Sequence, residues 1–276
     1  MSAPNTNTTT PRAATMRHAP VVLGRVSLWQ TGRVLLRMSW ARTITPVLLI
    51  AMLCLIALPM MFALVFASRG ALSGDPVPFL MQRYDQLVCA LATPVIALLL
   101  GTSAFSAEAD DGTLLYLVTT TTPRWWITFV RVAFASVGTA VMSALAVWAT
   151  GKIATGANDP QDVTRAFTLA TAFGGATYAA LFTTLSLATR RSLVAGLMYV
   201  LIWEGILSTT FPAIHYLSVR QWMLVVAHHF IDSADKVVMP GPSFTASLIG
   251  AGVVFIMAIL VGAQRLQRPR LSRIGT

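Results

Sequence analysis

The chain has 276 residues, of which 55% are hydrophobic and only 11% charged, and its formal net charge is +10. Soluble domains usually contain about 25% charged residues, so the composition excludes an ordinary soluble protein and indicates an integral membrane protein. Because the basic residues flank apolar runs, the positive charge indicates contact with a lipid bilayer and not with nucleic acid.

The two ends of the chain are polar. Residues 1–20 are rich in Thr and Pro and lack the apolar core of a signal peptide, so we expect a disordered cytoplasmic tail. Residues 264–276 form a basic tail, which we also expect in the cytoplasm.

Residues 21–45 predict an interfacial helix lying on the cytoplasmic leaflet. Three arginines fall on one helical stripe because their spacings are multiples of four: Arg25, Arg33 and Arg37. Trp29 and Trp40 suit the headgroup region. The alternative is a basic segment that only sets the topology.

Six apolar runs have the roughly 20 residues that cross a bilayer as a helix. The expected spans are Pro46–Ala67, about Gln86–Ser106, about Trp125–Thr150, about Ala166–Ala188, about Leu193–Ile214 and Ser243–Ala263. Residues 46–263 are therefore predicted to form a six-span, all-α polytopic domain. The fourth run is rich in Gly and Thr, which occur where membrane helices pack closely.

Charge counting predicts the orientation. With both termini inside, fourteen of the 20 Lys and Arg residues fall on the cytoplasmic side. The positive-inside rule therefore predicts cytoplasmic termini in a multi-pass protein of the cell (plasma) membrane. Three residues at the start of the third span are expected to anchor it at the interface: Trp125, Trp126 and Arg131.

The segment SAEADDGTLLYLVTTTTPRW, between the second and third spans, is the only predicted cytoplasmic segment with carboxylates: Glu108, Asp110 and Asp111. Asp111 can cap a short helix that begins at Gly112 or Thr113, where negative charge is favourable. Leu114 and Leu117 then share one apolar face with Val118. The segment is either a docking helix for another protein or an ordinary capped loop.

The same segment resembles the cytoplasmic signature of the ABC-2 family of ABC transporter permeases. The matching residues are Glu108, Asp110, Gly112, Thr113 and Leu114, with Asp in place of the usual second Glu. Arg124, Ile127 and Arg131 stand where the family has a basic, an aliphatic and a second basic residue. The usual proline position holds Thr121, and Pro123 lies two residues later. The stretch RRSLVAGLMYVLIWEGIL is similar to the family's link between spans four and five.

The resemblance implies the permease subunit of an ATP-driven transporter, an exporter working by alternating access. The acidic segment would be the coupling helix, contacting the ATPase through Glu108, Asp110, Asp111, Gly112, Thr113, Leu114 and Leu117. Two ABC ATPase copies, binding ATP and Mg, and a second permease subunit (in a homodimer or heterodimer) would complete the complex. The chain itself has no G-x-x-x-x-G-K-[ST] phosphate loop, so we expect neither an enzyme nor a bound cofactor or metal.

Glu204 is the only acid predicted inside a span, where ionisable groups usually face the bundle or a wet cavity. It is a candidate for gating or substrate contact, or for a structural hydrogen bond. His228 and Asp232 would lie four apart on a helix beside His229, but no well-spaced third metal ligand is evident. The alternatives to the permease are a proton-coupled secondary transporter using Glu204 and a non-transporting membrane scaffold.

Overall fold

The computed structural model describes residues 28–43, 45–69, 75–110, 123–156, 162–189, 191–231 and 241–267. Within these ranges the chain is helical and contains no strand. The elements are α1 (Leu28–Thr43), α2 (Pro46–Ser68), α3 (Pro76–Arg83), η2 (Tyr84–Ala92), α4 (Thr93–Asp110), α6 (Arg124–Thr155), α7 (Val163–Ala188), α8 (Ser192–Met198), η4 (Tyr199–Leu207), α9 (Ser208–Thr210), η5 (Pro212–Leu217), α10 (Val219–Phe230) and α11 (Phe244–Gln267).

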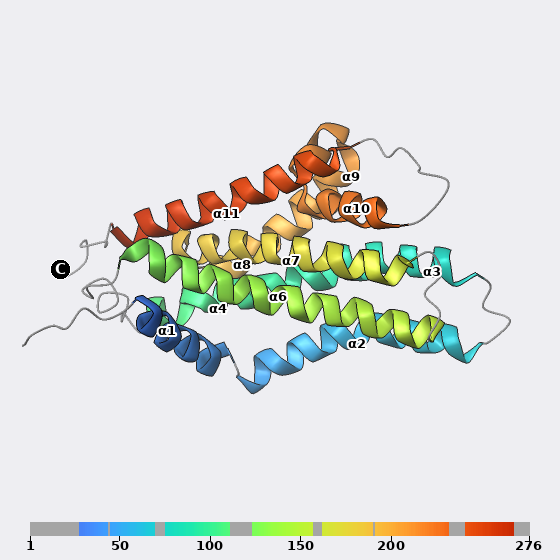
Figure 1. Cartoon of the computed structure of the whole chain (residues 1–276), viewed down its shortest axis with the longest axis horizontal. Helices are drawn as coiled ribbons and strands as arrows, with labels where there is room; N and C mark the ends of the chain where they lie inside the picture. Colours follow the sequence, from blue (N-terminus) through green and yellow to red (C-terminus); the bar gives the residue numbers. More distant parts are fainter. Residues whose placement is uncertain are drawn as a thin grey trace, which may run out of the picture.

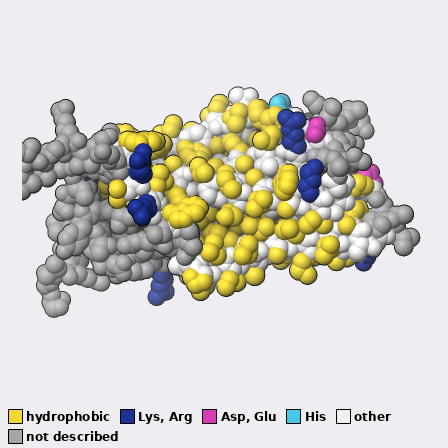
Figure 2. Space-filling model, turned by 60° about the horizontal axis from the view of Figure 1, so that its bottom comes forward, with side chains coloured by type: hydrophobic (Ala, Val, Ile, Leu, Met, Phe, Trp, Pro, Cys, Tyr) yellow, Lys and Arg dark blue, Asp and Glu magenta, His cyan; other side chains and the backbone are white. Residues whose placement is uncertain are grey.

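Five helices in the described part of the chain are long and apolar enough to cross a membrane. They are α2, the continuous helix formed by α3, η2 and α4, and the helices α6, α7 and α11. These helices lie side by side along the long axis of the molecule (Figure 1). Figure 2 shows hydrophobic side chains over the middle of one face, with Lys and Arg towards both ends. The expected all-helical, membrane-spanning architecture is confirmed at this level.

The expected fifth span is shorter than the other spans. Its apolar part covers Ser192–Leu207, α9 continues the helix to Thr210, and the chain leaves the helix before Pro212. At a rise of 1.5 Å per residue the apolar part is at most about 24 Å long, against a hydrocarbon core of about 30 Å. The count of six spans is therefore not confirmed. A proline at the first position of η5 explains why the helix does not continue to Ile214.

The second span begins well before the expected Gln86, at Pro76. Asp75 precedes this proline and accepts a hydrogen bond from the Val77 amide at 3.0 Å. An acidic N-cap followed by proline at the first helical position is a strong helix start. The polar residues Gln82, Arg83 and Asp85 obscured this start in the hydropathy pattern.

Helix α7 is the centre of the bundle and packs against α4, α6, α10 and α11. Its glycines allow the neighbouring elements to approach closely, because a side chain at Gly174 would overlap Met223 of α10. Two hydroxyls of α6 also bond to backbone carbonyls of α7, Ser136 to Ala176 at 3.0 Å and Ser143 to Thr171 at 3.1 Å. The small residues of the predicted fourth span thus serve close packing.

The closest approach of α4 to α7 provides a test of this packing. A methyl group added at Gly101 of α4 would lie 2.8 Å from Phe182 Cβ and 3.0 Å from the Thr183 backbone nitrogen. Because a backbone cannot swing aside, we expect Gly101→Ala to destabilise the protein by about 1–3 kcal/mol. The measurement is the melting temperature of the purified protein in detergent.

Gly252→Ala in α11 is the matched control, since nothing lies within 4 Å of a methyl group added there. Alanine favours a helix over glycine by roughly 0.5–1 kcal/mol, so this variant should melt at the same temperature as the wild type or slightly above it. Equal melting temperatures for the two variants would contradict the close contact at Gly101.

Candidate functional site

The acidic segment begins within a helix. Helix α4 extends through Asp110, so the helix continues past Ser106, where the second span was expected to end, and includes Glu108 and Asp110. The residues predicted to follow as a coupling helix, among them Asp111, Gly112, Thr113, Leu114 and Leu117, lie outside the described residues. The coupling helix therefore stays a prediction, whereas its first two acids belong to the last turn of α4.

Arg131 is buried beneath this end of α4. Its side chain is only 3% exposed, and Nη1 donates a hydrogen bond to the Ala104 carbonyl oxygen of α4. Its guanidinium carbon also lies 4.8 Å from the centroid of the Phe105 ring. In an α-helix the carbonyl of Ala104 is the acceptor for the amide of Glu108, four residues later. Arg131 therefore links α6 to the turn that carries the acids.

The prediction that Arg131 anchors the third span at the membrane surface is wrong. The face of α6 that carries it packs against α4, and a backbone carbonyl there supplies the partner that snorkelling would have sought in the headgroups. Trp125 is half-exposed, and its anchoring role stays a prediction. Trp126 instead stacks on Phe129, with ring centroids 5.5 Å apart, and contacts α1 at Gly32.

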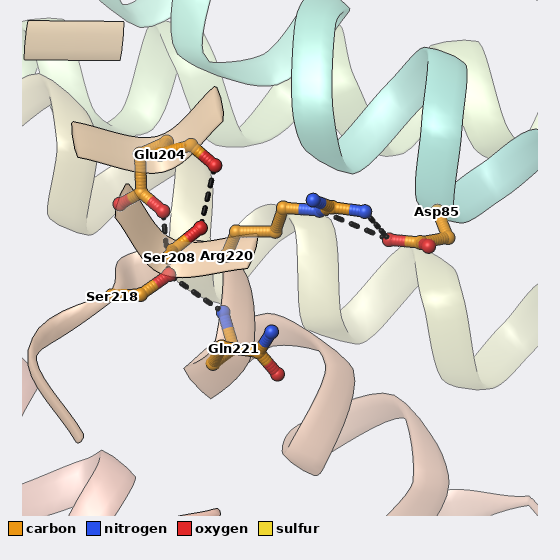
Figure 3. Close-up of polar contacts among 6 residues, drawn as sticks. All are labelled: Asp85, Glu204, Ser208, Ser218, Arg220 and Gln221. Carbon is orange, nitrogen blue, oxygen red and sulfur yellow. Dashed lines mark hydrogen bonds and ion pairs between the residues drawn. The ribbon is translucent and has the colours of Figure 1, made fainter. Parts of the chain in front are cut away.

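Glu204 of η4 holds the start of α10 (Figure 3). It is 2% exposed, and its Oε1 accepts hydrogen bonds from the Val219 amide at 3.0 Å and the Tyr199 hydroxyl at 3.4 Å. Its Oε2 accepts from the Ser218 hydroxyl. Both oxygens are thus occupied by hydrogen-bonding groups, three of them from Tyr199, Ser218 and Val219. A negative charge at the N-terminus of a helix is electrostatically favourable.

The remaining contacts of this cluster strengthen the same junction. Ser218 is the N-cap of α10, and its hydroxyl oxygen also accepts from the Gln221 amide at 3.3 Å. The Ser208 hydroxyl donates to the backbone carbonyl of Glu204, which fixes the end of η4. Glu204 therefore makes structural hydrogen bonds, whereas its part in gating or substrate contact stays a prediction.

A second acid holds α10 from another side. Asp85 Oδ1 accepts from Arg220 Nη2 at 2.7 Å and from Nε at 3.1 Å, so that the first turn of α10 is tied to η2 (Figure 3). Asp85 and Glu204 both lie in π-helical segments. Such segments interrupt the regular hydrogen-bond ladder and are frequent at functional sites. The polar cluster is thus built where two apolar helices depart from α-helical geometry.

The histidines of α10 do not form a metal site with other described residues. Among the described residues no group of three His, Cys, Asp or Glu side chains could hold a metal ion, and Asp232 lies outside them. The His229 ring stacks on Phe244 of α11 with centroids 4.1 Å apart. Burial lowers the pKa of His228 and so favours the neutral ring, while the negative charge of Asp85 acts in the opposite direction.

Sequence reasoning missed the partners of Glu204. The stretch Ser218-Val219-Arg220-Gln221 has the S-x-x-Q spacing of a capping box, which predicts a helix start at this point. That signal could have located α10. No local pattern links Asp85 to Arg220, because 135 residues separate them in the chain.

Comparison with known proteins adds no assignment. A scan against protein-family models and a search of curated proteins find no match for this chain. The likeness to ABC-2 permeases therefore depends on the residues quoted above.

The carboxylate clamp on α10 is testable. Glu204→Ala would leave the buried Ser218 hydroxyl and Val219 amide without their acceptor, at a cost of about 1–3 kcal/mol for each group. We expect faster hydrogen–deuterium exchange in residues 219–230, measured by mass spectrometry in detergent. Asp75→Ala is the control, because it removes an exposed cap of α3 worth about 1 kcal/mol and should leave exchange in α10 unchanged. Unchanged exchange in Glu204→Ala would contradict the clamp.

The ion pair between Asp85 and Arg220 should contribute less. The two side chains are 32% and 15% exposed, so solvent weakens their attraction. We expect a double-mutant cycle with Asp85→Asn and Arg220→Gln to give a coupling energy of about 0.2–1 kcal/mol, falling as salt is added. The measurement is thermal unfolding at two salt concentrations. A coupling energy that does not change with salt would contradict a solvent-screened pair.

Proposed function

We propose that this protein is the membrane permease subunit of an ATP-driven ABC transporter, of the ABC-2 type, acting as an exporter. The observation that carries the proposal is the acidic end of α4. Glu108 and Asp110 lie in the last turn of a membrane-spanning helix, directly before the Gly-Thr-Leu sequence that resembles the family signature.

The position of this turn supports a coupling role. Carboxylates at the C-terminal end of a helix destabilise the helix, because the helix dipole is negative there. A positively charged partner would offset this repulsion. Arg131 bonds to the preceding turn from α6 and so connects the acidic end to a second spanning helix. A force applied at Glu108 and Asp110 would therefore reach two helices of the bundle.

In this proposal, two copies of a separate ATPase bind ATP and Mg and contact the acidic segment from the cytoplasm. A second permease subunit, identical or similar, completes the pathway through the membrane. Closure of the ATPases would pull on the end of α4 and shift the bundle between its inward-facing and outward-facing states. Both termini of the chain would lie in the cytoplasm of a cell-membrane protein.

The geometry of Glu204 disfavours the alternative of a proton-coupled transporter. Its two oxygens are occupied by the start of α10, so that a change of protonation would disrupt the fold at this junction. A membrane scaffold that binds a protein other than an ATPase through Glu108 and Asp110 differs from the permease only in its partner. Identification of that partner therefore decides between the two.

Affinity purification of the tagged protein from its native membrane in mild detergent, followed by mass spectrometry, tests the proposal. We expect a stoichiometric soluble protein that contains a phosphate loop, and Mg-dependent ATP hydrolysis by the complex. Replacing Glu108 by Gln together with Asp110 by Asn should reduce recovery of the ATPase at least tenfold, because charge-assisted contacts at an interface typically contribute more than 1.4 kcal/mol.

The control removes two exposed acids from the other end of the bundle, through Asp75→Asn with Asp162→Asn. This variant should keep its ATPase. Recovery of the wild-type chain without any ATPase, in several detergents, would overturn the proposal. An ATPase retained by the variant of Glu108 and Asp110 would instead exclude these acids as its contact.

A further inference from the structure

Helix α1 has one buried face, which fixes its orientation on the bundle. Leu35 packs with Ile127 of α6 and Leu266 of α11. Gly32, on the same face, lies against the indole of Trp126. The helix is therefore attached where the start of α6 and the end of α11 meet (Figure 1).

The exposed side of α1, here called its outer face, combines aromatic and basic side chains. Trp29 is 69% exposed, and Trp40, whose ring also lies edge-on to Phe134 of α6 with centroids 6.4 Å apart, is 63% exposed. Arg33 and Arg37, four residues apart and thus neighbours on the helix surface, are also exposed. The guanidinium carbon of Arg33 lies 5.9 Å from the centroid of the Trp29 ring. An exposed arginine beside an exposed indole is suited to the depth of lipid headgroups, where apolar and charged surroundings meet.

The charges around this face of α1 are mainly positive. The sequence of α1 contains no Asp or Glu. Arg265, in the last turn of α11, is exposed beside the cluster of Leu35 and Leu266. The acids of the same end, Glu108 and Asp110, belong to α4. The outer face of α1 itself therefore presents only positive charge.

We propose that the outer face of α1 is a binding surface for anionic phospholipids, with Arg33 and Arg37 contacting the headgroup phosphate and the two tryptophans flanking it. Guanidinium groups bind phosphate oxygens through paired, charge-assisted hydrogen bonds. A zwitterionic lipid offers the same phosphate but adds a cation that the arginines repel. The surface therefore selects lipids by net charge, independently of any ATPase partner.

The test uses the full chain reconstituted into vesicles of phosphatidylcholine. Electron paramagnetic resonance measures the fraction of a trace spin-labelled lipid that the protein immobilises, for phosphatidylglycerol and for phosphatidylcholine in turn. Each basic residue near an anionic surface contributes about a fivefold preference. We expect the wild type to prefer phosphatidylglycerol, and Arg33→Gln with Arg37→Gln to lower that preference at least fivefold.

Two further variants isolate the contribution of α1. Arg33→Lys with Arg37→Lys keeps the charge and should keep most of the preference. Arg69→Gln with Lys152→Gln removes two exposed cations that follow α2 and lie near the end of α6, and it should leave the preference unchanged. An equal loss in this control would assign the preference to overall charge and overturn the proposal. Equal immobilisation of both lipids by the wild type would also overturn it.

Discussion

Inside the hydrocarbon core of a membrane, a polar group finds hydrogen-bond partners only within the protein, and the packing of this bundle follows from that constraint. Hydroxyl groups of α6 and α7 bond to carbonyls one turn earlier in their own helix, as Thr139 does to Ala135 at 2.8 Å. Others reach across to the neighbouring helix, as Ser143 does to Thr171. Because these groups are satisfied, the small side chains can let the backbones approach closely without a polar penalty.

The two buried charged side chains described above obey the same constraint at opposite helix ends. Arg131 donates to a carbonyl near the C-terminal end of α4, where the helix dipole is negative. Glu204 accepts from the first residues of α10, where the dipole is positive. Both side chains are thus held by backbone groups of a neighbouring helix. Arg131 fixes the part of α4 that precedes the acidic turn, and Glu204 fixes the start of α10.

The sequence was sufficient to predict the parts of the fold that depend on local pattern. Apolar runs gave α2, α6, α7 and α11, and the spacing of Arg33 and Arg37 indicated α1 within residues 21–45. The helix start at Asp75 and Pro76 also has a sequence signal, but the polar residues after it lowered the hydropathy of the first turns. The prediction failed where the outcome depended on which face met a neighbour. The residues that flank Arg131 in the sequence would be the same whether it faced lipid or α4, so they do not reveal which of the two it contacts.

The polar cluster at α10 shows the same limit. Glu204 could be recognised as unusual, because an acid in an apolar run is rare. The role of Glu204 could not be predicted, because Ser218 and Val219 reach it through tertiary packing and not through a motif. Pattern thus identifies which residues need partners, and only the fold identifies the partners.

The short helix formed by α8 and η4 has a consequence for the lipid around the protein. Its 7 and 9 residues together have half the length of α6, which has 32. Lipid beside a short apolar segment thins, or the segment is covered by a neighbouring protein surface, at a cost of fractions of a kcal/mol per ångström. Where lipid borders this helix, we therefore expect the bilayer to be thinner than it is beside α6.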